Sequence, residues 1–122
     1  MEQRFYADHL RRQHGLEVLV PDAEDRELVH RVIFEELCRG IVEPRSRDAY
    51  RRVVDRLVAR GAEGIILGCT EIMLLLDPHD LPVPGFDSTA LHARQAVAWM
   101  IDDARPGRPQ WERTTETMET TA

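Results

Sequence analysis

The residues best suited to chemistry in this sequence are Cys69, Thr70 and Glu71, which follow a short apolar run, residues 65–67, set between two glycines. Such a run is typical of a buried strand, and the residues after it can begin a helix. Cys69 is therefore expected at the carboxyl end of a strand, where open α/β sheets bind ligands. Backbone N–H groups at a helix start would lower the pKa of this thiol and could hold a carboxylate. The alternative is a buried, inert cysteine.

The other side chains that could do chemistry have simpler interpretations. Cys38 lies beside the apolar stripe of a predicted helix, so we expect it to be buried. His92 is in the second turn of the last predicted helix, from which it could reach a site at the sheet edge, but satisfaction by a cap or by solvent is the favoured interpretation. One predicted helix has an arginine-rich outer face, and the i,i+4 pairs Asp48–Arg52 and Arg51–Asp55 favour a solvated, salt-bridged surface over a phosphate site.

Hydrophobic periodicity predicts the elements that must position Cys69. Helices are expected over residues 2–13, 22–38, 46–60, 72–76 and 88–101, and strands or extended segments over 16–20, 64–67 and 81–86. Gly15 is expected to end the first helix, Asp22 and Ser46 to cap the next two, and Asp87 or Ser88 to cap the last. The fold class is α/β, with a small parallel sheet and flanking helices.

Composition restricts the class of protein. The chain has 122 residues, 43% of them hydrophobic, and a net charge of −6 with acidic and basic residues intermixed, so neither nucleic acid nor a membrane is expected as a partner. No apolar segment approaches a membrane span of about 20 residues and the N-terminus is too polar for a signal peptide, so we expect a cytoplasmic protein. None of the 16 basic residues is lysine, which excludes a Schiff-base lysine and a pyridoxal phosphate enzyme of the usual kind.

The chain divides into three predicted regions. Residues 1–86 form an α/β domain with the cysteine motif, 87–104 form the final helix, and 105–122 are a proline-, threonine- and glutamate-containing tail that we expect to be disordered.

Four segments, in this order, resemble the C-terminal half of the aspartate/glutamate racemase family. They are Met1-Glu2-Gln3-x-Phe5-Tyr6, Asp25-Arg26-x-x-Val29-His30, Gly68-Cys69-Thr70-Glu71 and Phe86-Asp87-Ser88-Thr89-x-x-His92. The resemblance extends from Met1 to about Ile101, and it implies a fold corresponding to one lobe of a two-lobed racemase.

The resemblance also implies a chemistry. In such enzymes, without a cofactor or metal, two cysteines face each other across an amino acid, one removing the α-proton and the other returning one to the opposite face. Cys69 matches the second cysteine, and Thr70 would help to hold the substrate's α-carboxylate. Glu71 stands where glutamate racemases have a histidine, so the chain looks more like the aspartate-racemase branch, with Glu71 also at the substrate.

The sequence departs from the family in two ways. Members are about twice as long, and nothing here matches their first catalytic cysteine, so we expect a truncated member whose final helix, 87–104, would pack on the missing lobe. A homodimer or a separate N-terminal lobe could then serve as partner. Aspartate-acting members also use a lysine near the end of the helix that contains the Asp25-Arg26 motif, and Arg39 is the basic residue in that neighbourhood that could bind the substrate.

Two other functions are compatible with the residues. One is a single-cysteine relative resembling arylmalonate decarboxylase, in which a lone thiol protonates an enediolate. The other is a non-catalytic fragment that folds only by pairing with a separate lobe or with itself.

Overall fold

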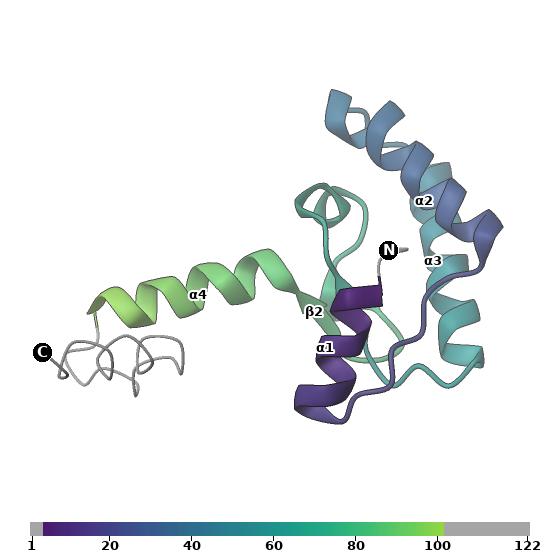
Figure 1. Cartoon of the computed structure of the whole chain (residues 1–122). Coiled ribbons are helices and arrows are strands. Elements are labelled where there is room, and N and C mark those ends of the chain that lie inside the picture. The colour runs from purple at the N-terminus through teal and green to yellow at the C-terminus, as the bar shows by residue number, and fades with distance from the viewer. Residues whose placement is uncertain (1–3, 102–122) are drawn as a thin grey trace, which may run out of the picture. The chain divides into compact units, whose positions relative to one another are not determined.

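The computed structural model describes residues 4–101, and the chain separates into two compact units, Met1–Thr89 and Ala90–Ala122, which are treated separately below (Figure 1). The helices are α1 (Arg4–His14), α2 (Ala23–Glu35), α3 (Pro44–Ala59) and α4 (Ser88–Ile101). Short 3₁₀ helices are η1 (Leu37–Arg39), η2 (Thr70–Leu74) and η3 (Pro78–Asp80), and the strands are β1 (Ile65–Leu67) and β2 (Gly85–Asp87).

The sheet consists of β1 and β2, which pair in parallel with Ile66 opposite Phe86. β2 packs so closely on η3 that a Cβ on Gly85 would lie 2.7 Å from the Pro78 carbonyl oxygen, which explains the glycine at this position. An α/β fold with a small parallel sheet and flanking helices is therefore confirmed. The sequence predicted an extended segment from residue 81, but the second strand begins only at Gly85.

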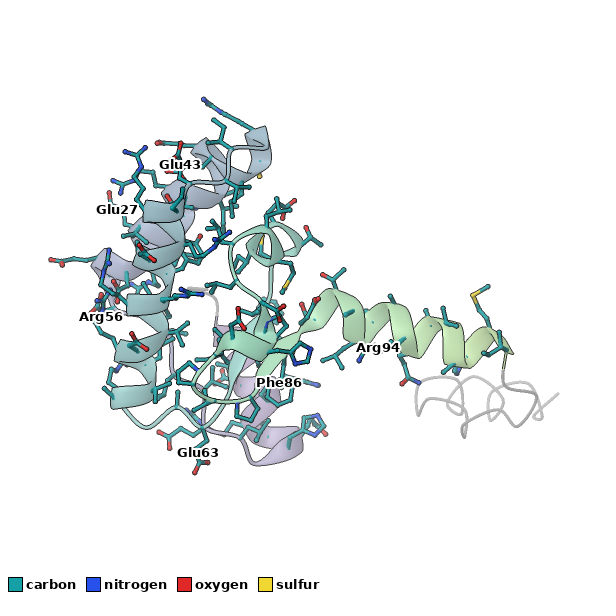
Figure 2. All side chains as sticks on the ribbon, turned by 180° about the vertical axis from the view of Figure 1, so that it is seen from behind. Glu27, Glu43, Arg56, Glu63, Phe86 and Arg94 are labelled. Carbon is teal, nitrogen blue, oxygen red and sulfur yellow. The ribbon has the colours of Figure 1, made fainter. Side chains whose placement is uncertain are left out.

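The hydrophobic core lies between one face of β1 and the helices α2 and α3. Ile65 and Leu67 are buried while Ile66 between them is exposed, and Phe86 on β2 is also exposed (Figure 2). The remaining buried apolar side chains come from the helices and the turns: Val29, Val32, Leu37, Tyr50, Val53, Val54, Leu75 and Leu76.

Local capping residues set the starts and ends of the helices. Two predictions for α3 are wrong: its first residue and the role of Ser46 as its cap. Asp22 caps α2 by accepting a hydrogen bond from the Asp25 amide at 3.1 Å, and Gly15 ends α1 with φ 66°, both as predicted. α3, however, begins at Pro44, because proline at the first helical position loses no intrahelical hydrogen bond. Ser46 is instead buried, and its hydroxyl donates to Glu36 Oε2 at 2.5 Å.

The predicted burial of Cys38 is wrong. α2 ends at Glu35, three residues earlier than expected, and the 3₁₀ turn of η1 follows. A 3₁₀ helix has about 3.0 residues per turn, so the helical stripe does not continue through it. Leu37 takes the buried position with 2% exposure, and Cys38 is exposed.

Residues 16–20 do not form the predicted strand. The carbonyl at the end of this segment, on Val20, accepts a hydrogen bond from the Arg60 guanidinium at 3.0 Å and not from a neighbouring strand. Alternating apolar residues form a strand only where a neighbouring strand is available for backbone hydrogen bonds.

The arginines of α3 reach other elements. Arg56 Nε donates to Asp25 Oδ2 of α2 at 2.7 Å, and Arg47 Nε donates to the Leu75 carbonyl at 2.9 Å. The two ion pairs predicted within α3 are not formed among residues 4–101, since exposed i,i+4 pairs gain little and leave the side chains free for other contacts.

Along α4 from Leu91 to Ile101, every residue is exposed. In the described part of the chain, no helix combines the length and the apolar character needed to cross a membrane. The predicted disordered tail lies outside the described residues.

Candidate functional site

Cys69 lies at the carboxyl end of β1, as the sequence predicts. β1 ends at Leu67, and Cys69 is the N-cap residue of η2 in an extended conformation, φ −136° and ψ 131°. Its side chain is half-buried, so the thiol can be reached from one side. The thiol therefore stands at the sheet edge where parallel strands present ligand-binding groups.

A single carboxylate oxygen joins the three predicted site residues Cys69, Thr70 and Glu71. The Cys69 thiol donates to Glu71 Oε2 at 3.0 Å, and the Thr70 hydroxyl donates to the same oxygen at 2.6 Å. A thiol and a hydroxyl are thus held beside one negative charge.

This contact reverses the expected protonation of the cysteine. Burial and the hydrogen bond to Glu71 raise the pKa of Cys69 above its ordinary value, and the backbone N–H groups of Glu71 and Ile72 oppose this without overcoming it. The predicted lowering of the Cys69 pKa is therefore wrong, because the helix that follows is a short 3₁₀ helix and a carboxylate lies against the sulfur. Cys69 rests as a thiol.

The carboxyl group responds in the opposite direction. Hydrogen bonds from Cys69 and Thr70 lower the pKa of Glu71, so this side chain is ionised at neutral pH. Ionised Glu71 and protonated Cys69 therefore form a hydrogen-bonded pair in which the proton stays on the sulfur.

A buried tyrosine that sequence reasoning missed, Tyr50, interacts electrostatically with Cys69. Tyr50 is 3% exposed and its hydroxyl donates to the Val29 carbonyl at 2.9 Å. Burial raises the pKa of Tyr50, and the charges of Glu36 and of Cys69, once that thiol ionises at higher pH, raise it further, so the phenol stays neutral. Its place on the apolar stripe of α3, three residues before Val53, was the available signal.

Arg39 is not brought to the cysteine. It is exposed at the end of η1, an element that contacts η2, and among residues 4–101 no hydrogen bond or ion pair links it to Cys69, Thr70 or Glu71. In the same described range, no three His, Cys, Asp or Glu side chains gather closely enough to bind a metal ion.

The hollows of the surface are not centred on the thiol. One of about 220 Å³ is lined by two arginines of α3, by the end of η2 and by two aspartates: Arg47, Arg51, Met73, Leu74, Leu75, Leu76, Asp77 and Asp80. A second, of about 440 Å³, is lined by residues 78–79 and 81–85. Cys69 lines neither of these two hollows.

Comparison with known proteins gives a consistent result. The family model for Asp/Glu/Hydantoin racemase matches residues 2–96. The crystal structure of a proposed Asp/Glu racemase from Yersinia pestis is 53% identical, with a TM-score of 0.77, over 83% of this chain and 44% of that one. An aspartate racemase homologue from Pyrococcus horikoshii OT3 is 36% identical, with a TM-score of 0.71, over 80% of this chain and 42% of that one. The chain spans less than half the length of both.

Proposed function

The chain belongs to the Asp/Glu/hydantoin racemase family, and from this membership we propose that it transfers the α-proton of an amino acid with Cys69 as the acid/base group and without a cofactor. The observation that carries the proposal is the hydrogen bond from the Cys69 thiol to Glu71 Oε2. A reactive thiol needs a reducing compartment, so we place the protein in the cytoplasm.

The Cys69–Glu71 contact suits both directions of proton transfer. As a thiol, Cys69 can protonate an α-carbanion. The proton on its sulfur, which is hydrogen-bonded to Glu71, then forms the new C–H bond, and Cys69 becomes a thiolate. As a thiolate, its raised pKa makes it a stronger base toward a weakly acidic C–H group. The raised pKa thus lowers the amount of thiolate but increases the basicity of each one.

The same segment offers groups for the substrate. We assign the Thr70 hydroxyl and the backbone N–H of Glu71 to the α-carboxylate, because both lie at the start of η2 beside the sulfur. Glu71, predicted as a substrate-binding residue, gains a second role as the partner of the thiol. Arg39 is assigned to the side-chain carboxylate of an acidic substrate, which requires it to reach toward η2 from η1.

The chain supplies one lobe of the site in this proposal. It matches the solved relatives over 83% and 80% of its own length but over 44% and 42% of theirs. Inversion at the α-carbon needs an acid/base group on each face, and the sequence motif that carries the first cysteine in the family is not found here. We therefore propose that this chain contributes the second cysteine of such a site.

Exchange of the α-proton tests the proposal. The chain is incubated in D2O with each enantiomer of aspartate, glutamate and several neutral amino acids, and loss of the α-proton signal is followed by NMR. Exchange should fall by about 10²-fold or more in Cys69→Ser, the range of one acid/base group. Cys38→Ser, at the exposed cysteine of η1, is the matched control and should keep the exchange. Equal rates in the two variants would reject Cys69 as the base.

A second function draws on the protonation of Cys69. A thiol that rests protonated is what a single-cysteine decarboxylase needs to protonate an enediolate. Release of CO₂ from an arylmalonate, lost in Cys69→Ser, would favour this function over α-proton exchange from amino acids.

A further inference from the structure

We propose that the hollow of about 220 Å³ lined by α3, the end of η2 and residues 77 and 80, here called the α3 hollow, binds a small zwitterion. The ligand is an amino acid whose carboxylate binds the arginines of the hollow and whose ammonium group binds its aspartates. The hollow lies within the unit Met1–Thr89, and Cys69 is not among its lining residues. This inference goes beyond the proposed function and does not depend on it.

The α3 hollow is lined by equal numbers of positive and negative side chains. Arg47 and Arg51 are four residues apart on α3, so they are neighbours on one face of that helix. Asp77 and Asp80 come from the two ends of η3. A simple anion would face two carboxylates here, and a simple cation would face two guanidinium groups. A molecule with one charge of each sign avoids both repulsions.

The opposite charges of the α3 hollow do not neutralise each other. Within residues 4–101, neither Arg47 nor Arg51 forms an ion pair, whereas Arg56 of the same helix pairs with Asp25. Arg51 makes no hydrogen bond within that range either. Because the side chains of both signs line one hollow without pairing, there is room between them for a ligand that carries both charges.

One side chain of each sign is held by the backbone. Arg47 Nε donates to the Leu75 carbonyl at 2.9 Å, and Asp77 Oδ1 accepts from the His79 amide at 2.8 Å. In the described part of the chain, the two Nη atoms of Arg47 and Oδ2 of Asp77 make no hydrogen bond, so these atoms are available to a ligand. Charged groups that are already positioned lose less conformational freedom on binding, which favours affinity.

The volume of the α3 hollow limits the size of the ligand. Pockets that enclose drug-sized molecules have about 300–1,000 Å³, so a hollow of about 220 Å³ suits a smaller molecule. A nucleotide is too large to be enclosed, whereas a single amino acid has the appropriate size and carries both charges at neutral pH.

Ligand titration tests which charges the hollow recognises. The isotope-labelled full chain is titrated with L-alanine and with two analogues that each lack one charge, N-acetyl-L-alanine and L-alaninamide, while NMR follows the backbone amides. L-Alanine should shift residues 73–77 in a saturable manner, and both analogues should bind about tenfold or more weakly, since each leaves one set of charges without a partner. Equal binding of either analogue overturns the proposal, as do shifts confined to residues 69–72, which would place the amino acid at the thiol.

A substitution on α3 tests the carboxylate-binding half of the site. Arg51→Gln removes one guanidinium from the hollow, and Arg52→Gln, at the next residue of α3 and outside the hollow, changes the net charge equally and is the control. Circular dichroism establishes that both variants are folded. Arg51→Gln should weaken L-alanine binding about tenfold or more, and Arg52→Gln should bind as wild type does. Equal affinities of the two variants, or absence of binding to the folded wild type, would contradict the proposal.

A second substitution tests the ammonium-binding half. Asp80→Asn removes one carboxylate from the hollow, and Glu63→Gln, at an exposed residue outside it, is the control of equal charge change (Figure 2). Asp80→Asn should bind L-alanine more weakly than the control but N-acetyl-L-alanine more tightly, because one repulsive charge is gone. If the two ligands change in the same direction, the aspartates do not distinguish an ammonium group from an anion and the proposal is wrong.

Discussion

The polar side chains of the helical layer, formed by α2, η1 and α3, bond across long distances in the sequence, whereas Cys69, Thr70 and Glu71 at the carboxyl edge of the sheet bond to one another. Arg56 reaches Asp25 and Tyr50 reaches Val29, in each case joining α3 to α2. Cys69 and Thr70, by contrast, both donate to Glu71, two residues or one residue away.

The difference separates the groups that hold the fold from those available for chemistry. A bond between two helices fixes tertiary structure, so removing it costs stability. A bond between adjacent residues closes no long loop, and its partners can turn toward a substrate while the helices remain in place. Substitutions in the two regions should therefore change different quantities.

The largest stability effect is expected in the leucine run beside the site. Leu76 is 2% exposed and Leu74 is 50% exposed. Leu76→Ala should lower the free energy of unfolding by about 2–5 kcal/mol through lost burial and a cavity, while Leu74→Ala should change it by less than about 0.5 kcal/mol. Urea unfolding of both variants measures this, and equal losses would show that η2 is more tightly packed than its exposure indicates.

A smaller effect is expected from the hydrogen bond between the helices. Tyr50→Phe leaves the Val29 carbonyl without its side-chain donor and should cost about 0.5–1.5 kcal/mol. Tyr6→Phe, at an exposed tyrosine on α1, is the matched control and should be neutral. Thermal unfolding compares the two. If Tyr50→Phe is as stable as the control, the hydrogen bond from Tyr50 to the Val29 carbonyl does not hold α3 to α2.

The smallest structural effect, with a clear chemical one, is expected at the sheet edge. Glu71→Gln removes the negative charge that favours the thiol, so the pKa of Cys69 should fall. Made in a Cys38→Ser background, the variant should react with iodoacetamide at lower pH than its parent, because the thiolate is the reactive form. A profile that stays in place or moves to higher pH would assign the raised pKa to burial alone.

Much of the fold and site is predictable because it depends on local sequence. Asp22 caps a helix through an amide three residues away, Gly15 ends one through its own backbone freedom, and Cys69 follows a strand defined by its immediate neighbours. Each of these requires information from only a few adjacent residues.

The errors arise where distant contacts or small changes in helical geometry decide the result. The segment before Pro21 forms no ladder, and Val20 is bound instead by Arg60, forty residues away. Cys38 is exposed because α2 ends early and a 3₁₀ turn follows. The direction of the Cys69 pKa depends on the orientation of the Glu71 side chain, which spacing alone does not specify. The packing of the final helix on another lobe stays a prediction.

The central claim is that an amino acid binds against Cys69 at the carboxyl edge of the sheet. Protection from alkylation tests it most directly, with Cys38→Ser as the starting protein so that Cys69 is the remaining thiol. Iodoacetamide labelling is timed by mass spectrometry with and without saturating aspartate or glutamate, each enantiomer in turn. The account predicts that at least one of these amino acids slows labelling of Cys69. Identical rates under all conditions would contradict it.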